Sequence, residues 1–281
     1  MDHSNLTVVA VYGHTDGSSA IASLHKSMTS LPGSRGLLLS PKRPDNLPWY
    51  IEHKCIFALD YLQYSWFMMY ALHNFIYTSH ALIVQDDGWV IDGNNFDPDW
   101  YGYDYIGAPT HCALTADKYY YNWTWQQVDE PMQVIQNGGL SLRSKRLMQA
   151  PGKHGIMHRA FNVQPFCNED VQLSGFMRND LEKIGMCYAP DDVAKLFSLE
   201  YCGPGFHDDF DFSKLFGCHA PTRKLVSANQ LFVNVTKNNP DEMVGERRFL
   251  DFLSSKGYSI EYFKIKDSEQ AGTQEADTQA L

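Results

Sequence analysis

A short apolar strand that ends in a polar turn constrains this chain more than any other feature. All four residues of Ala81–Val84 are apolar, and the turn Gln85–Gly88, with two adjacent aspartates, follows at once. Apolar runs of this length are typical of strands in parallel sheets, which are buried on both faces. Open α/β sheets bind their ligands at the carboxyl ends of their strands. The segment therefore predicts an α/β fold with a ligand site at this turn.

Acidic residues continue beyond the turn, with no lysine or arginine among them. They are Asp86, Asp87, Asp92, Asp97, Asp99 and Asp104. Two carboxylates about 4 Å apart repel by about 4 kcal/mol at an effective dielectric constant of about 20. A divalent cation offsets this repulsion, and oxygen-rich sites suit Mg²⁺ or Mn²⁺, particularly when phosphate oxygens complete the shell. We therefore expect a metal–phosphate site here, with a solvated acidic loop as the alternative.

The composition fits one folded domain with an acidic surface. Of the 281 residues 44% are hydrophobic, and the formal net charge is −10. Such a surface repels duplex nucleic acid and anionic membranes, and no apolar run approaches the ~20 residues of a membrane-spanning helix. The six cysteines are widely spaced and form no C-x-x-C pair. With no secretory signal after Met1, we expect a cytoplasmic protein with reduced thiols and no zinc site.

Alternating strand and helix patterns predict a mixed, mostly parallel sheet flanked by helices. Strands are expected at 6–12, 36–39, 81–84, 104–108, 138–142, 232–236 and 260–265. Helices are expected at 18–31, 56–75, from Ser144 onward, at 170–184 and at 246–255. The expected architecture is a single Rossmann-like domain over residues 1–266.

The remaining segments are predicted to connect these elements. Ser18 or Ser19 is expected to cap the first helix, and residues 41–48 form a loop broken by prolines. Residues 110–136 are rich in tyrosine and tryptophan and indicate a loop or hairpin. Residues 199–211 are expected to form another loop. Residues 267–281 have no apolar anchors, which predicts a disordered tail.

Six short segments, in order, carry a resemblance to a known family. They are Tyr64–Met68, Leu82–Gly88, Tyr103–Pro109, Asn137–Ser144, Asn168–Asp170 and Phe216–His219. Each segment is weak alone, but together they resemble a bacterial and viral family of glycosyltransferase-like proteins, known mainly as a domain of unknown function. The chain is similar to nucleotide-sugar transferases of the GT-A fold over about residues 6 to 235. The resemblance implies a GT-A-like fold and sugar transfer.

The resemblance also implies a metal site. GT-A enzymes carry an Asp-x-Asp motif at a strand end, and its last aspartate binds the metal that holds the donor diphosphate. Asp87 takes that position here, and Gln85 replaces the first acid. The amide of Gln85 can still hydrogen-bond a ribose hydroxyl or a metal-bound water. His219 matches a late histidine that completes the metal shell in relatives, with a loop histidine as the alternative.

By the same resemblance, one residue of the pair Glu169 and Asp170 is the catalytic base, and we favour Asp170. A helix start orients a carboxylate and favours its charge, although a plain N-cap pair is the alternative. Adjacent glycines at Gly138 and Gly139 permit positive φ and close approach, as in a tight turn or in the floor of a donor site. Arg143 can reach the diphosphate, since a guanidinium matches phosphate oxygens.

Further contacts are expected around the donor and the acceptor. Residues expected to bind the nucleotide-sugar are Tyr12, Ser65, Gln85, Asp86, Gly138, Gly139 and Arg143. Tyr12 follows the first strand and is expected to pack against the base, or else in the core. Trp100, Trp123 and Trp125 are hypothesised to stack on an acceptor sugar.

These observations predict a glycosyltransferase that uses Mn²⁺ or Mg²⁺ and a nucleotide-diphosphate sugar as donor. Inversion at the sugar carbon is expected, with a glycan or glycoconjugate as acceptor. One alternative is transfer to hydroxymethylated bases of DNA, which the acidic charge disfavours. Another is a nucleotide-sugar-binding module without catalysis, which the replacement by Gln85 keeps open.

Overall fold

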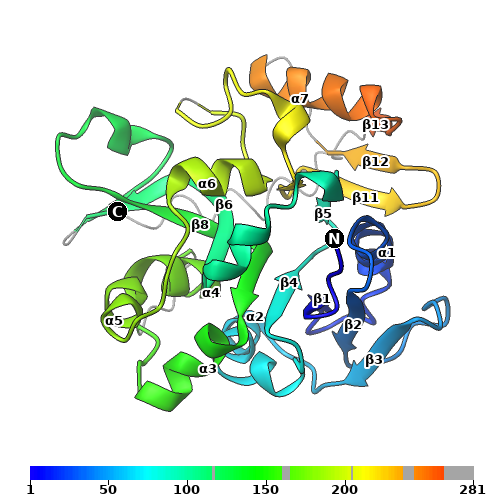
Figure 1. Cartoon of the computed structure of the whole chain (residues 1–281), viewed down its shortest axis with the longest axis horizontal. Helices are drawn as coiled ribbons and strands as arrows, with labels where there is room; N and C mark the ends of the chain where they lie inside the picture. Colours follow the sequence, from blue (N-terminus) through cyan, green and yellow to red (C-terminus); the bar gives the residue numbers. More distant parts are fainter. Residues whose placement is uncertain (116–117, 160–164, 204, 237–243, 263–281) are drawn as a thin grey trace, which may run out of the picture.

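The fold is a mixed α/β sheet with helices on both faces, as predicted. The computed structural model describes residues 1–115, 118–159, 165–203, 205–236 and 244–262, and Figure 1 shows their arrangement. The predicted tail at 267–281 lies outside the described residues. Among the described residues, no helix is both long and apolar enough to cross a bilayer.

Seven strands form the main sheet. In spatial order they are β3 (Ile51–Cys55), β2 (Arg35–Ser40), β1 (Leu6–Val11), β4 (His80–Ile83), β8 (Gln133–Ser144), β6 (Tyr105–Leu114) and β7 (Tyr119–Tyr120). Strands β3, β2, β1 and β4 are parallel, whereas β8 runs antiparallel to both β4 and β6. The carboxyl ends of β1, β4 and β6 therefore meet at one edge of the sheet.

Two smaller sheets complete the strands. The first contains β5 (Gly88–Val90), β10 (Gly217–His219) and β9 (Ser198–Leu199), and the second contains β11 (Arg223–Ser227), β12 (Phe232–Val235) and β13 (Ser259–Tyr262). Strand β5 starts directly after the polar turn that follows β4. The first small sheet therefore extends from the edge where the main strands end.

Seven α-helices in the described part of the chain surround these sheets. They are α1 (Ile21–Ser30), α2 (Tyr61–Trp66), α3 (Lys145–His154), α4 (Glu169–Val171), α5 (Arg178–Lys183), α6 (Asp191–Phe197) and α7 (Val244–Ser255). Two π-helical turns, η2 (Phe67–Ala71) and η7 (Gln172–Phe176), continue α2 and α4. The 3₁₀ turns are η1 (Ser18–Ala20), η3 (Leu72–Asn74), η4 (Gly93–Asn95), η5 (Pro98–Gly102), η6 (Thr124–Gln127) and η8 (Phe212–Lys214).

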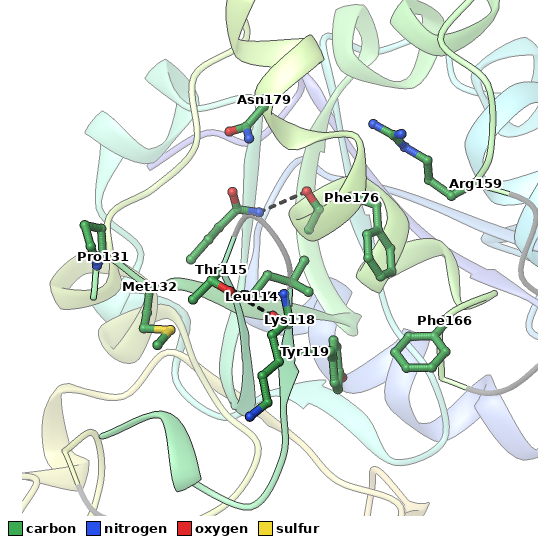
Figure 2. A pocket seen from close by; sticks show the side chains of 12 residues that line it. Leu114, Thr115, Lys118, Tyr119, Pro131, Met132, Arg159, Phe166, Phe176 and Asn179 are labelled. Atoms are coloured by element: carbon green, nitrogen blue, oxygen red, sulfur yellow. Dashed lines mark hydrogen bonds between the residues drawn. The ribbon is translucent and has the colours of Figure 1, made fainter. Parts of the chain in front are cut away.

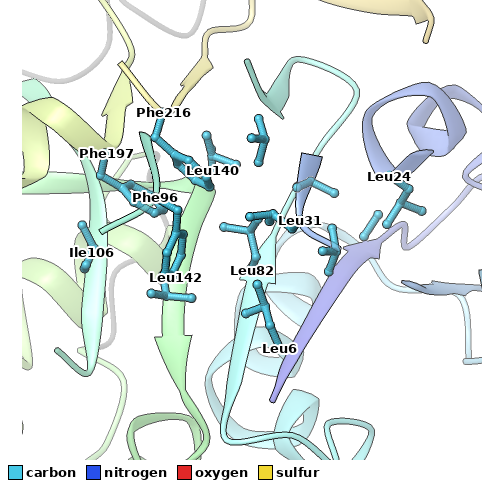
Figure 3. Packing of buried hydrophobic residues seen from close by; sticks show 14 of the residues in the cluster. Leu6, Leu24, Leu31, Leu82, Phe96, Ile106, Leu140, Leu142, Phe197 and Phe216 are labelled. Carbon is cyan, nitrogen blue, oxygen red and sulfur yellow. The ribbon is translucent and has the colours of Figure 1, made fainter. Parts of the chain in front are cut away.

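The core follows the alternation of side chains along the strands. On β1, Leu6 and Val8 pack in a cluster with Leu24 of α1 and Phe197 of α6 (Figure 3). Val9 faces the opposite side and joins a second cluster with residues of α2, η2 and α3. Both sheet faces are therefore covered, which explains why β1 and β4 read as continuous apolar runs.

A third cluster joins the two small sheets to α7. Trp89 of β5 and Cys218 of β10 pack with Val233 of β12 and Phe249 of α7. Figure 1 places α7, β11, β12 and β13 together, on the side of the molecule opposite α2 and α3. These C-terminal elements support the strand that ends in His219.

Several predicted boundaries are wrong. The helix predicted at 56–75 begins only at Tyr61, because Asp60 forms a capping box with Gln63 and the chain before it continues from β3. Neither Ser18 nor Ser19 caps the first helix, since both lie inside the 3₁₀ turn η1 and the N-cap position of α1 is Ala20, without a side-chain bond. The hairpin expected at 110–136 is confirmed by β6, β7 and β8, which extend into it.

Candidate functional site

The turn after β4 aims its two aspartates at different partners. Gln85 and Gly88 bond each other through both backbone N–H groups, at 3.2 and 3.1 Å, which closes the turn tightly. Asp86 pairs with Lys224, whose Nζ lies 3.1 Å from Asp86 Oδ2. Asp87, whose side chain is 13% exposed, faces His219 instead. The turn therefore places the carboxylate of Asp87 beside this histidine.

His219 lies directly beside Asp87. Strand β10 pairs antiparallel to β5 with His219 opposite Gly88, and His219 Nε2 is 3.4 Å from Asp87 Oδ1. Burial opposes the charged form of both groups, but each stabilises the charge of the other. The net effect lowers the pKa of Asp87 and raises the pKa of His219. Two segments far apart in sequence thus meet as a buried acid–imidazole pair.

Strand β8 passes against this pair at Gly139, and its neighbour Gly138 lies against Glu169, Arg143 and Asp170. A Cβ built on Gly139 would lie 2.2 Å from His219 Nε2 and 2.7 Å from Gln85 Oε1. The predicted glycine turn is wrong, because both glycines lie inside β8 and neither is among the glycines with positive φ. The predicted close approach is what requires them. Gly139 therefore leaves room for the imidazole of His219.

Asp170 and Glu169 reach the same stretch of β8 from the start of α4. Gly138 N donates to Asp170 Oδ2 at 3.1 Å, and Arg143 Nη2 donates to Glu169 Oε1 at 2.9 Å. Arg143 is fully buried and also donates to the Gly138 carbonyl. Burial, and then the charge of Glu169, raises the pKa of Asp170 to about 6. The two acids thus differ, since Glu169 has a cationic partner whereas Asp170 accepts from the backbone amides of Gly138 and Val171.

The structure adds two residues that the sequence analysis missed. Glu200, just after β9, is buried, and Asn137 Nδ2 donates to its Oε1 at 3.3 Å. Burial raises the pKa of Glu200 to about 8. The charge of His219 lowers this pKa, and the charge of Asp87 raises it. Tyr64 OH accepts from Gln85 Nε2 at 3.1 Å. Glu200 directly follows the short strand β9, as the two aspartates of the turn follow β4. This shared pattern could have identified Glu200 from the sequence.

Two of the donor-site candidates have hydrogen-bond partners within the protein, and a third is buried. Tyr12 OH accepts from Asp86 N at 3.0 Å, which ties the end of β1 to the turn after β4. Ser65 is buried on α2, beside Tyr64. Arg143 is held by Glu169 and by Ser141, whose Oγ accepts from Nε at 3.0 Å. The structure thus brings Tyr12 and Asp86 together, and it keeps Arg143 inside the protein.

The acidic stretch as a whole does not gather at the site, which corrects one expectation. Asp92 pairs with Lys256, and Asp97 caps η5 through the N–H of Asp99. Asp104 precedes β6, at the opposite edge of the sheet, and bonds Arg146 there. The short 3₁₀ turns redirect the chain between these aspartates, so that only Asp87 enters the site.

The three tryptophans expected at an acceptor have different environments. Trp100 is a core residue, 3% exposed and packed against Phe197, so its expected role as a sugar platform is wrong. Trp123 and Trp125 lie half-buried with ring centroids 6.3 Å apart. That Trp123 and Trp125 stack on an acceptor sugar stays a prediction.

The pair of Asp87 and His219 is suited to hold part of a metal shell. Asp87 Oδ1 is buried without a hydrogen-bond partner in the described structure. Two ligands about 2.1 Å from one ion, at a right angle, lie about 3 Å apart, which is close to the observed 3.4 Å. Within the described ranges no group of three or more His, Cys, Asp or Glu side chains could hold a metal. The remaining ligands would therefore come from substrate and water.

Fold and site together define an α/β protein with a buried acid–imidazole pair at the end of its central strand. A family model described as a protein of unknown function (DUF5672) matches residues 54–219. Because this span is more than half of the chain, the protein belongs to that family. The span runs from the end of β3 to His219 and encloses both residues of the pair. No curated protein matches the chain.

Proposed function

We propose that this protein is a metal-assisted glycosyltransferase with a GT-A-like fold, which moves a sugar from a nucleotide-diphosphate sugar to an acceptor hydroxyl. One observation carries the proposal. Asp87, His219 and Asp170 come from three separate segments and converge around the two glycines of β8. Inverting sugar transfer can use this combination, since positive charge stabilises the departing diphosphate and a base takes the proton of the acceptor hydroxyl.

Asp87 would supply the carboxylate oxygen that Mn²⁺ and Mg²⁺ prefer, and His219 would add an imidazole nitrogen to the same ion. The bound ion would supply Lewis-acid stabilisation of the departing diphosphate. Gln85, whose Oε1 lies on the same side of Gly139 as His219, is placed to hydrogen-bond the donor. Its amide is fixed by donation to Tyr64 OH at 3.1 Å.

Asp170 is the proposed base. In a single displacement, the acceptor oxygen bonds to the anomeric carbon, the bond from that carbon to the diphosphate breaks, and Asp170 takes the hydroxyl proton. A base works best when its pKa is near the operating pH, and burial raises the pKa of Asp170 to about 6. Glu169 is less suited, because Arg143 already binds its Oε1 at 2.9 Å.

Arg143 then acts as a positioning residue in place of the predicted diphosphate contact. It is fully buried, and its guanidinium joins Glu169 to the Gly138 carbonyl. An ion pair of this kind fixes the start of α4 against β8. Removing one partner of a buried pair costs about 3–5 kcal/mol, because the other charge stays buried.

A second candidate is a nucleotide-sugar-binding module without catalysis. The observation that favours it is the neutral Gln85 in place of an acid, together with only two metal-ligating side chains in the described site. Such a module would bind the donor without turning it over. Donor hydrolysis in the absence of acceptor, a common side reaction of active transferases, separates the two candidates.

The test is a screen of nucleotide-diphosphate sugars for release of the nucleotide, with Mn²⁺ and with excess chelator. We expect release with at least one donor, and loss of about 100-fold or more in Asp87→Asn, because the metal supplies several kcal/mol of charge stabilisation. Asp92→Asn is the matched control. It removes a carboxylate of the same stretch that pairs with Lys256, away from the site.

Full activity of Asp87→Asn, or unchanged activity in chelator, would contradict the metal role. Donor binding without any release would favour the non-catalytic candidate.

A further inference from the structure

A cavity of about 660 Å³ lies at the far end of β8, beyond the site. It opens between the β6–β7 hairpin and the turn η7, and Figure 2 shows its lining side chains. Pockets of about 300–1,000 Å³ bind small ligands. Nothing in the proposed donor site uses this cavity.

One wall of the cavity is aromatic. Figure 2 shows Tyr119, Phe166 and Phe176 grouped on the same side. The rings of Tyr119 and Phe166 meet edge to face at 5.1 Å, and those of Phe166 and Phe176 lie 6.1 Å apart. Aromatic walls bind ligands with a partly apolar surface, and the C–H face of a sugar ring is one.

The charged groups of the lining are both positive. Lys118 and Arg159 line the cavity, and no aspartate or glutamate is among its described lining residues. This contrasts with a chain whose formal net charge is −10. Arg159 faces Asp180 at 3.8 Å, but both side chains are largely exposed, and exposed ion pairs are worth only about 0–1 kcal/mol. The guanidinium can therefore turn to an anionic ligand at small cost.

Hydrogen bonds connect the wall of the cavity to Asp170. Phe176 ends the turn η7, which continues α4, and lies six positions after Asp170. Ser174 Oγ donates to the Asp170 carbonyl at 2.7 Å, and Gln133 Nε2 donates to the carbonyls of Ser174 and Gly175. The cavity wall and the proposed base thus belong to one hydrogen-bonded unit.

We propose that this cavity binds a saccharide that carries a negative charge, as a carboxylate or a phosphate group. The sugar ring packs on the aromatic wall and Arg159 binds the anion, while Lys118, whose Nζ lies 4.7 Å from the centroid of the Tyr120 ring, adds positive charge to the lining. The further assignment as acceptor site, with the reacting hydroxyl toward Asp170, rests on the proposed function. The class of ligand does not, because it follows from the lining alone.

Binding of matched probes by ligand-observed NMR tests the proposal. Methyl β-D-glucuronide is compared with methyl β-D-glucoside, and glucose 6-phosphate with glucose. We expect at least one anionic probe to bind about tenfold or more tightly than its neutral partner, and this preference to vanish in Lys118→Gln/Arg159→Gln. The control Arg35→Gln/Lys153→Gln removes the same charge from two exposed positions outside the lining and keeps the preference.

The two pairs of probes also distinguish a carboxylate ligand from a phosphate ligand. A preference for glucuronide alone assigns a carboxylate, and one for glucose 6-phosphate alone assigns a phosphate. Equal binding of charged and neutral probes would overturn the proposal, as would a preference that survives in Lys118→Gln/Arg159→Gln. Anion preference in a protein that never releases nucleotide from a donor would support the cavity's ligand and contradict only the proposed function.

Discussion

Asp170 is the residue on whose protonation the proposed reaction depends. Burial, followed by the charge of Glu169, raises its pKa from 3.8 to about 6. A base must be deprotonated to accept the hydroxyl proton. We therefore expect the rate of sugar transfer to rise with pH through about 6 and then level off. A pH–rate profile of kcat/KM measures this, and a rate that falls over the same range would contradict the assignment.

Asp170→Asn separates the catalytic role from a structural one. The folded-state pKa is raised, so neutral Asp170 contributes stability at low pH, and this contribution is lost as pH rises through about 6. The amide cannot ionise and still offers an oxygen to Gly138 N. At pH 8 the variant should lose about 10²–10⁴-fold in turnover without a lower Tm. A matching loss of Tm in thermal denaturation would indicate a structural residue instead.

At the residue scale, the sequence identified several charged residues of the site, but it did not predict which side chains each of them contacts. Acids after an apolar strand are visible locally, but Asp87 and His219 were singled out by the resemblance to GT-A enzymes, and they do lie together. Glu200 and Tyr64 were missed, since their place in the site depends on pairings across the fold. Arg143 was expected to reach a ligand, but its burial beside Glu169 depends on where α4 packs.

At the scale of elements, the closeness of β8 to β10 controls the position of His219. A Cβ on Gly139 would come within 2.2 Å of His219 Nε2, so Gly139→Ala must displace the imidazole. We expect loss of metal-dependent activity together with destabilisation of about 1–3 kcal/mol, typical of overpacking. Activity assays and urea denaturation measure both effects.

Gly102→Ala is the control, because a Cβ there meets nothing within 4 Å and its φ is not positive. It should keep both activity and stability. Wild-type activity in Gly139→Ala would contradict the close approach of β8 to His219.

Strands were predicted correctly where the apolar pattern is long. They were missed where strand formation depends on pairing with distant segments. The apolar run of β1 predicts its strand almost to the residue, since both faces are buried. Strands β5, β9 and β10 were missed because two or three residues carry no period, and their pairing partners are distant. The glycines at 138–139 were read as a turn, although steric contact across the sheet, invisible in the sequence, is what requires them.

At the scale of the whole molecule, the C-terminal elements hold the site from outside the main sheet. Leu225 N donates to the carbonyl of Asp86 at 2.9 Å, and Ala220 N donates to that of Asp87 at 3.0 Å. The same elements share a core with Trp89, on the strand that follows Asp87, and with Cys218, on the strand that ends in His219. The α/β class was predictable from composition and alternation, but this support was not, because it arises from packing between distant segments.

The most direct test of the central claim is donor binding measured by thermal denaturation. A ligand that binds only the folded state raises Tm by mass action. With at least one nucleotide-diphosphate sugar, we expect Mn²⁺ and donor together to raise Tm by about 5 °C, more than either alone. In Asp87→Asn and His219→Ala this joint increase should disappear. No increase with any donor, or the same joint increase in both variants, would contradict the claim that Asp87 and His219 hold a metal–diphosphate group.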